Sequence, residues 1–240
     1  MLDALKNWFR RGGAAQGPAE AVAQWARQRE LVFRPVRDGD GFVVEGKVGT
    51  ALWRLEWGPS QRPYVDGAEL RLRAELGLPV DLQALVLNRE LKDMMEKEVF
   101  DQFVEDVQTR IDTSTPPEMR WLVMLPKLTG AELKGVRERY AAVSSAKPWL
   151  MSWLDGPLSQ ELMAAPRVAG QPVVLMVGRG RLTLRTALPE PDLPRLEAWL
   201  KLFETSIREA NRVTVDMVDS QAPSTQPSLW SRPDGGSSPG

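Results

Sequence analysis

The stretch Glu69-Leu-Arg-Leu-Arg-Ala-Glu-Leu76 alternates charged and apolar side chains from end to end. Successive side chains of a β-strand point to opposite faces, so this pattern predicts a strand with one apolar face and one charged face. Pro79-Val80-Asp81 follows, with Asp81 as a helix N-cap, and the apolar periodicity after it predicts a helix over residues 82–111. A half-buried strand of this kind is typical of antiparallel sheets.

Further strand and helix signals lie on both sides of this stretch. A second hairpin is predicted at residues 172–188, where Gly178-Arg179-Gly180 joins two β-rich runs, and Asp192 is expected to cap a last amphipathic helix. The remaining expected strands are residues 31–36, 42–48 and 51–57, and the remaining expected helices are residues 19–30, 130–143 and 148–163, with Asp155-Gly156-Pro157 as a candidate interruption of the last. Residues 119–125 are either a strand or a helix, and we favour the helix.

These elements predict an α+β fold, in which long amphipathic helices pack on one face of an antiparallel sheet of hairpins and a meander. We expect a short amphipathic segment and linker at residues 1–17, an α+β body at 18–219, and a disordered Ser/Pro/Gly-rich tail at 220–240. Strand, proline, aspartate and helix follow one another in both parts of the body. Either residues 18–112 and 113–219 are two related halves, or both use a common local pattern.

The order helix, three-strand meander, helix, hairpin, helix resembles the layout of small bacterial secretion chaperones and related adaptor folds. The resemblance rests on element order alone, and the helices expected between Gly130 and Met163 depart from it. It implies a chaperone-like, protein-binding role.

The chain has no histidine and no cysteine among its 240 residues. Ser-His-Asp and Cys-His hydrolysis, zinc sites and iron–sulfur clusters are therefore excluded for this chain alone. Asp38-Gly39-Asp40-Gly41 has two carboxylates at the spacing of a calcium loop, but the third carboxylate and the distant glutamate are missing, so a turn is favoured. We name no catalytic residue and expect no metal and no cofactor.

The chain carries 31 basic and 32 acidic residues, a net charge of −1. Nucleic-acid binders usually show a basic excess, so we expect no nucleic-acid partner. No stretch approaches the roughly 20 apolar residues that cross a bilayer, and no secretory signal is present, so a cytoplasmic location is expected. Residues 1–11 are amphipathic; they either contact a membrane surface or a partner, or fold back on the body, which we favour.

Arg179, Arg181 and Arg185 are the first candidate binding residues, since the stretch from Pro166 to Leu188 holds no aspartate or glutamate. Guanidinium groups bind phosphates and carboxylates through paired hydrogen bonds. In one interpretation these arginines bind a phosphate or an acidic partner. In the other they pair with the acidic face of the helix predicted at residues 82–111, or across a self-association interface.

Leu229 and Trp230 are the second candidate binding residues, because they form an apolar island in a polar tail. Such an island is either a short docking motif for a partner or a chance feature of an untethered end.

Our leading hypothesis is a non-enzymatic protein-binding or adaptor module, with self-association as one form of the protein partner. One alternative is a hydrolase or transferase that works with carboxylates and arginine, and another is a peripheral membrane protein held by residues 1–11. The acidic cluster Glu98, Asp101, Glu105 and Asp106 is expected to be a solvated helix face. The residues that the enzymatic alternative would use are Glu98, Asp101, Arg181 and Arg185.

Overall fold

The computed structural model describes residues 17–36, 40–104 and 115–221, with side chains left out at 101–104 and 218–221. The described residues form one eight-stranded sheet in the order β1-β2-β3-β4-β8-β7-β5-β6, in which every neighbouring pair is antiparallel. The strands are β1 (Val32–Pro35), β2 (Phe42–Val48), β3 (Ala51–Pro59), β4 (Ala68–Glu75), β5 (Ala84–Asn88), β6 (Tyr140–Ser144), β7 (Val173–Gly178) and β8 (Arg181–Ala187).

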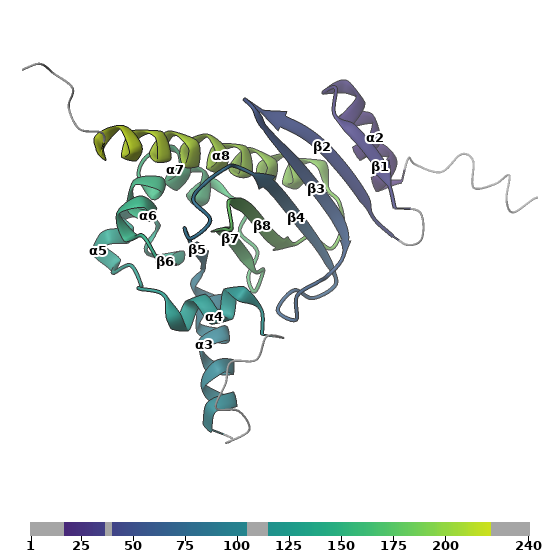
Figure 1. Cartoon of the computed structure of the whole chain (residues 1–240). Helices are drawn as coiled ribbons and strands as arrows, with labels where there is room; N and C mark the ends of the chain where they lie inside the picture. Colours follow the sequence, from purple (N-terminus) through teal and green to yellow (C-terminus); the bar gives the residue numbers. More distant parts are fainter. Residues whose placement is uncertain (1–16, 37–39, 105–114, 222–240) are drawn as a thin grey trace, which may run out of the picture.

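Helices lie on both sides of this sheet (Figure 1). The predicted α+β class is confirmed, and the 172–188 hairpin is present as β7 and β8. The helices are α2 (Pro18–Gln28), α3 (Arg89–Val104), α4 (Pro117–Met124), α5 (Gly130–Leu133), the 3₁₀ turn η2 (Lys134–Val136), α6 (Lys147–Leu154), α7 (Pro157–Ala164) and α8 (Leu193–Gln221).

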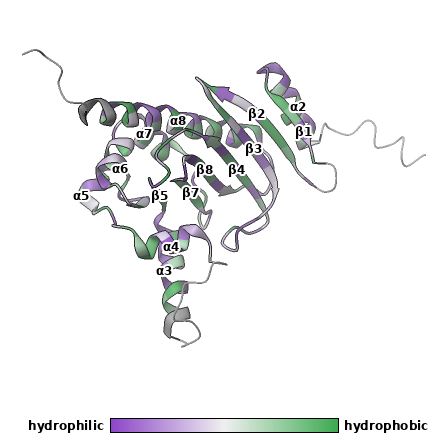
Figure 2. Cartoon of the chain, viewed as in Figure 1, coloured by the Kyte–Doolittle hydropathy of each residue, from purple (hydrophilic) through white to green (hydrophobic). Residues whose placement is uncertain are grey.

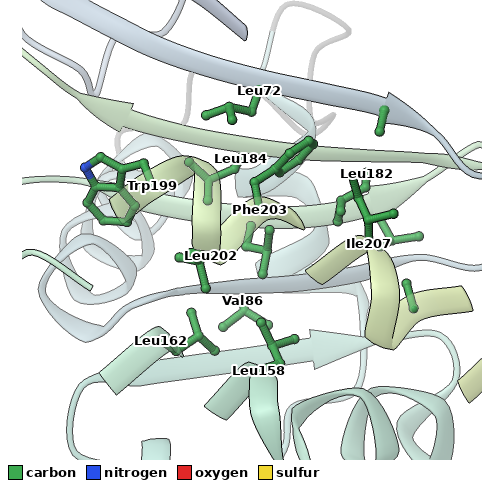
Figure 3. Close-up of a cluster of buried hydrophobic side chains, with 14 of the residues drawn as sticks. Leu72, Val86, Leu158, Leu162, Leu182, Leu184, Trp199, Leu202, Phe203 and Ile207 are labelled. Carbon is green, nitrogen blue, oxygen red and sulfur yellow. The ribbon is translucent and has the colours of Figure 1, made fainter. Parts of the chain in front are cut away.

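The main core lies between one sheet face and the helices α2, α6, α7 and α8. Hydrophobic and hydrophilic residues alternate along α8, which lays its apolar side on the strands (Figure 2). Figure 3 shows Phe203 and Ile207 of α8 against Leu182 and Leu184 of β8. Burial of this apolar face supplies the main driving force for the α8–sheet contact.

A second, smaller core lies on the opposite face of the sheet, so the expectation that the long helices pack on one face is wrong for α3. Leu91 and Met95 of α3 and Met119 and Leu122 of α4 are buried there, above β5, β6 and β7. Because α3 and α4 pack mainly over this end, their apolar core does not extend over the same face of β4 and β8, which α4 reaches through the Glu118 side chain. This uncovered part of the sheet is where the charged side chains gather.

The helix predicted over residues 82–111 is wrong at its start. Ala84–Asn88 is the strand β5, and α3 begins only at Arg89. β5 lies between β6 and β7, so Ala84 and Val86 face one core while Leu85 and Leu87 face the other. A strand buried on both faces lacks alternation, and its continuous apolar run cannot be distinguished from a helix by periodicity.

The helix predicted over 130–143 is also wrong in its second half. α5 and η2 end at Val136, and Tyr140–Ser144 forms the edge strand β6. All five β6 residues are buried, so this strand also shows no polar face in its sequence. The helix predicted at 148–163 is interrupted where Gly156, with φ 93°, separates α6 from α7.

The proposed halves of the body contribute interleaved strands to one sheet. β5 comes from residues 18–112 but lies between β6 and β7, which come from residues 113–219. The relation of the two halves by duplication stays a prediction, beside the alternative of a common local pattern. The expectations for residues 1–11, for the turn at Asp38 and for the tail from residue 222 lie outside the described residues.

Candidate functional site

The uncovered sheet face carries charged side chains in cross-strand register. In β4 these are Glu69, Arg71, Arg73 and Glu75, and in β8 they are Arg181 and Arg185. Arg71 is directly opposite Arg185, and Glu75 is directly opposite Arg181. The alternation seen in the sequence thus places all of these groups on the face opposite the main core.

Two ion pairs on this face, Arg185–Glu69 and Arg181–Glu75, differ sharply in burial. Arg185 Nη1 donates a hydrogen bond of 2.5 Å to Glu69 Oε1, where the Glu69 side chain is fully buried and that of Arg185 is 9% exposed. Arg71 also donates to Glu69, through Nη1 at 3.2 Å. The Arg181–Glu75 pair, in contrast, is exposed on both sides. The Glu69 cluster is therefore a structural ion network, because buried charges persist only when they are paired.

A further buried carboxylate, Glu118, reaches this network from α4. Its Oε1 accepts hydrogen bonds of 3.1 Å from Arg62 Nε and from the Tyr64 hydroxyl, and lies 3.8 Å from Arg185 Nε. Burial raises the pKa of the Tyr64 hydroxyl, and the neighbouring Glu118 charge adds to the effect. Tyr64 is consequently a neutral donor, and Glu118 ties α4 to the sheet.

Glu56 of β3 links the network to the more exposed strands. Burial by itself would raise the pKa of Glu56, but hydrogen bonds from Arg54 and Arg71 and the charge of Arg73 outweigh it, so the pKa lies below its usual value. The Arg73 Nη2–Glu56 Oε1 distance is 2.6 Å. Glu56 thus stays ionised and holds three arginine side chains on the uncovered face.

Between this face, α4 and the β7–β8 turn lies a cavity of about 530 Å³. Among the described residues its lining contains no aspartate or glutamate. We call it the arginine pocket, after the six arginines in its lining: Arg62, Arg73, Arg120, Arg179, Arg181 and Arg185.

Two arginines of the pocket have no carboxylate partner within the described part of the chain, namely Arg120 and Arg179. The Nε atoms of Arg120 and Arg185 are buried and make no hydrogen bond. A buried donor without a partner costs free energy, so an acceptor that enters the cavity, a water or an anion, would stabilise these groups. Carboxylates and phosphates are the acceptors that guanidinium groups bind best.

The shape of the pocket depends on the tight β7–β8 turn. Arg179 and Gly180 both have positive φ, 55° and 75°, as a type I′ hairpin turn requires. The turn thereby presents Arg179 at its exposed tip, while Gly180 O accepts a hydrogen bond from Leu76 N. At Gly178, where β7 ends, the ring of Trp121 from α4 lies so close that an added Cβ would come within 2.5 Å of it. Trp121 therefore forms a wall of the pocket.

The structure brings together Arg179, Arg181 and Arg185, the three arginines singled out in the sequence. Of the two interpretations, one has these arginines pair within the fold, and Arg181 and Arg185 do so, but with Glu75 and Glu69 of β4 instead of the acidic helix. In the enzymatic alternative, Glu98 is exposed on α3 outside the pocket lining, and the Asp101 side chain lies outside the described set. Leu229 and Trp230 also lie outside the described residues.

Sequence reasoning missed Arg62, Arg73, Arg120 and Glu118. Arg73 belongs to the charged face of residues 69–76, and the alternation there gives no sign of a cavity. Arg62 belongs to a loop and Arg120 to α4, and no local pattern connects them with the hairpin. Only the register of β4 against β8 and the position of α4 place these groups in one cavity.

The fold and the site define an α+β protein with an arginine-lined cavity on the uncovered face of an antiparallel sheet. Searches against protein-family models, curated proteins and solved structures find no match. In the described ranges, no helix is long and apolar enough to cross a membrane, and no group of three or more metal-ligating side chains comes together. The resemblance to secretion chaperones stays a prediction.

Proposed function

We propose that this protein is a non-enzymatic cytoplasmic protein-binding module, and that the arginine pocket binds an acidic segment of a protein partner. The observation that carries the proposal is a cavity lined by six arginines and by no carboxylate of the described chain, in which Arg120 and Arg179 lack ion-pair partners. An acidic side chain entering the pocket would supply the missing acceptors.

The distribution of charge favours an acidic protein segment over a nucleic acid. The chain as a whole has a net charge of −1, and the pocket brings two arginines without an ion-pair partner, Arg120 and Arg179, into one cavity. Exposed Glu75 stands at its border beside Arg181. A nucleic-acid backbone needs a basic stripe that follows successive phosphates, whereas an acidic side chain needs only one such cavity.

The pocket lining supports a binding role rather than a proton-transfer role. Glu118, a carboxylate beside the pocket arginines, is fully buried and hydrogen-bonded to Arg62 and Tyr64. General acid–base chemistry needs a titratable group within reach of a substrate, and arginine stays protonated. The site as described holds anions and has no exposed carboxylate in its lining with which to move a proton.

The experiment is a tagged pull-down from the native cell, read by mass spectrometry after nuclease treatment. It compares the full chain with an Arg120→Ala/Arg179→Ala double variant and with a chain ending at Ser220. Arg137→Ala is the control, since Arg137 is exposed and lies outside the pocket lining.

We expect a partner that is retained by the full chain, by the truncated chain and by Arg137→Ala, and is lost from the double variant. Loss only on truncation would place the contact in the tail, near Leu229 and Trp230, and would refute the pocket assignment. A complex that nuclease abolishes would indicate a nucleic acid instead of a protein.

A further inference from the structure

A second cavity adjoins the arginine pocket, and it is lined by side chains of the uncovered sheet face together with Trp53 and Ala74 of the main-core face. Its volume is about 750 Å³, and its lining comes from the end of α2 and from β1, β2, β3, β4 and β8. Arg73 and Arg181 line both cavities, so the two meet at these side chains. We call the combined feature the trough.

Strand register gives the direction and length of the trough. One cross-strand row of residues lines it from β1 to β7, and every step of the row is a direct register pair. Neighbouring strands are about 4.8 Å apart, so this row is about 24 Å long and runs across the strands. The row consists of Val32, Glu45, Arg54, Arg73, Thr183 and Met176.

The second cavity differs from the arginine pocket in its apolar content. Leu52 is 72% exposed and Val32 is 49% exposed, and both line it. Neither is covered by another element of the described chain. Single exposed apolar residues are common on proteins, but these two lie inside a cavity next to an arginine cluster.

Charges in the second cavity are mostly neutralised. Glu45 pairs with Arg34 and Arg54, at 3.2 Å in both cases, and Glu75 pairs with Arg181. The electrostatic attraction for an anion is therefore strongest at the α4 end of the trough. At the β1 end the strongest available contribution is the burial of Leu52 and Val32.

We propose that the trough binds an extended segment of the partner protein. This segment places acidic side chains in the arginine pocket and an apolar side chain against Leu52 and Val32. At about 3.3 Å per residue, about seven extended residues match the row. This inference rests on the proposed function and adds the conformation, length and composition of the bound segment. The segment crosses the strands instead of adding to a sheet edge.

The test is an affinity selection of random displayed peptides, each longer than the trough, on the immobilised full chain. Enriched peptides are resynthesised with a fluorescent label, and their dissociation constants are measured by anisotropy. The variants are Arg120→Ala/Arg179→Ala for the pocket and Leu52→Ser for the apolar end. Val215→Ser is the control, because Val215 is an exposed apolar residue of α8 that lines neither cavity.

We expect enriched peptides to hold acidic residues together with a large apolar residue within about seven positions. Leu52→Ser should raise the dissociation constant of such a peptide about tenfold. It should not change the dissociation constant of the same peptide with serine in place of its large apolar residue. Val215→Ser should change neither.

The possible failures are distinguishable. Peptides that are acidic and depend on Arg120 and Arg179, but show no apolar preference and no effect of Leu52→Ser, would overturn this inference and leave the proposed function standing. A selection that yields no acidic enrichment, or peptides that bind the double variant equally well, would overturn both.

Discussion

Arg185 of β8 and Glu69 of β4 form a hydrogen-bonded ion pair of 2.5 Å in which neither side chain is more than 9% exposed. Replacing Glu69 by Gln would leave Arg185 and Arg71 buried without their shared countercharge. Removing one partner of a buried pair is strongly destabilising, so we expect Glu69→Gln to lower the free energy of unfolding by about 3 kcal/mol. Urea denaturation measures this change.

The matched control for Glu69 is Glu75, which stands on the same strand and face and pairs with Arg181 of β8. Both partners of that pair are exposed, so Glu75→Gln should cost less than about 1 kcal/mol. Equal losses in the two variants would contradict the claim that the Glu69 cluster is the structural part of the site.

Gly178 and Trp121 give a second prediction. An alanine at position 178 would bring its Cβ to 2.5 Å from the Trp121 ring, which must then move. We expect Gly178→Ala to lower the free energy of unfolding by about 1 kcal/mol and to alter the pocket wall. Gly135→Ala is the control, since a Cβ there meets nothing within 4 Å and the residue has no positive φ. A melting-temperature comparison would refute the packing argument if the two variants behaved alike.

We expect Arg120 to contribute to partner binding and to lower the stability of the unliganded protein. Its Nε is buried without a hydrogen-bond partner, and five other arginines line the same cavity. Arg120→Met removes an unsatisfied donor and a repelling charge, so we expect a gain of up to about 1 kcal/mol in the unliganded protein. Arg62→Met, which removes a partner of buried Glu118, should instead destabilise the protein. Destabilisation by both variants would show that Arg120 is a structural residue.

The lowered pKa of Glu56 predicts that the stability of the fold depends on pH. Its folded-state pKa is depressed below the ordinary value of 4.5. A carboxyl group of this kind stabilises the fold fully above its unfolded-state pKa, and that contribution is lost as the pH falls through the lower folded-state value. Glu56→Gln should therefore be less stable than the parent at neutral pH, and the difference should shrink below pH 4.5. Thermal melts across this range measure it, and a gap that stays constant on acidification would contradict the assignment.

The parts of the fold that alternate in sequence were predictable. β4 and β8 each have one core face and one polar face, and the Arg179-Gly180 turn carries a hairpin signature. β5 and β6 were not predictable from periodicity, because both are buried on both sides and their sequences resemble short buried helices. Their strand state follows from non-local pairing with β7 and with each other.

The candidate site was predictable only in its local part. Arg179, Arg181 and Arg185 stood out because their stretch lacks acidic residues. Arg62 and Arg120 join them only through tertiary structure, in which Glu118 anchors α4 beside β8. Glu118 itself gave no sequence signal, since a glutamate in the first turn of a helix is an ordinary choice beside the helix dipole.

The most direct test of the account is site-specific photo-crosslinking in the native cell, with benzoylphenylalanine at Met124. This residue is exposed and lines the arginine pocket, while Val215, exposed on α8, is the control position. We predict a discrete protein adduct at Met124, mapped to an acidic segment of the partner, which disappears with Arg120→Ala/Arg179→Ala and is missing at Val215. An adduct at Met124 that the double arginine substitution leaves unchanged, or no protein adduct at Met124, would contradict the claim that the arginine pocket binds an acidic partner.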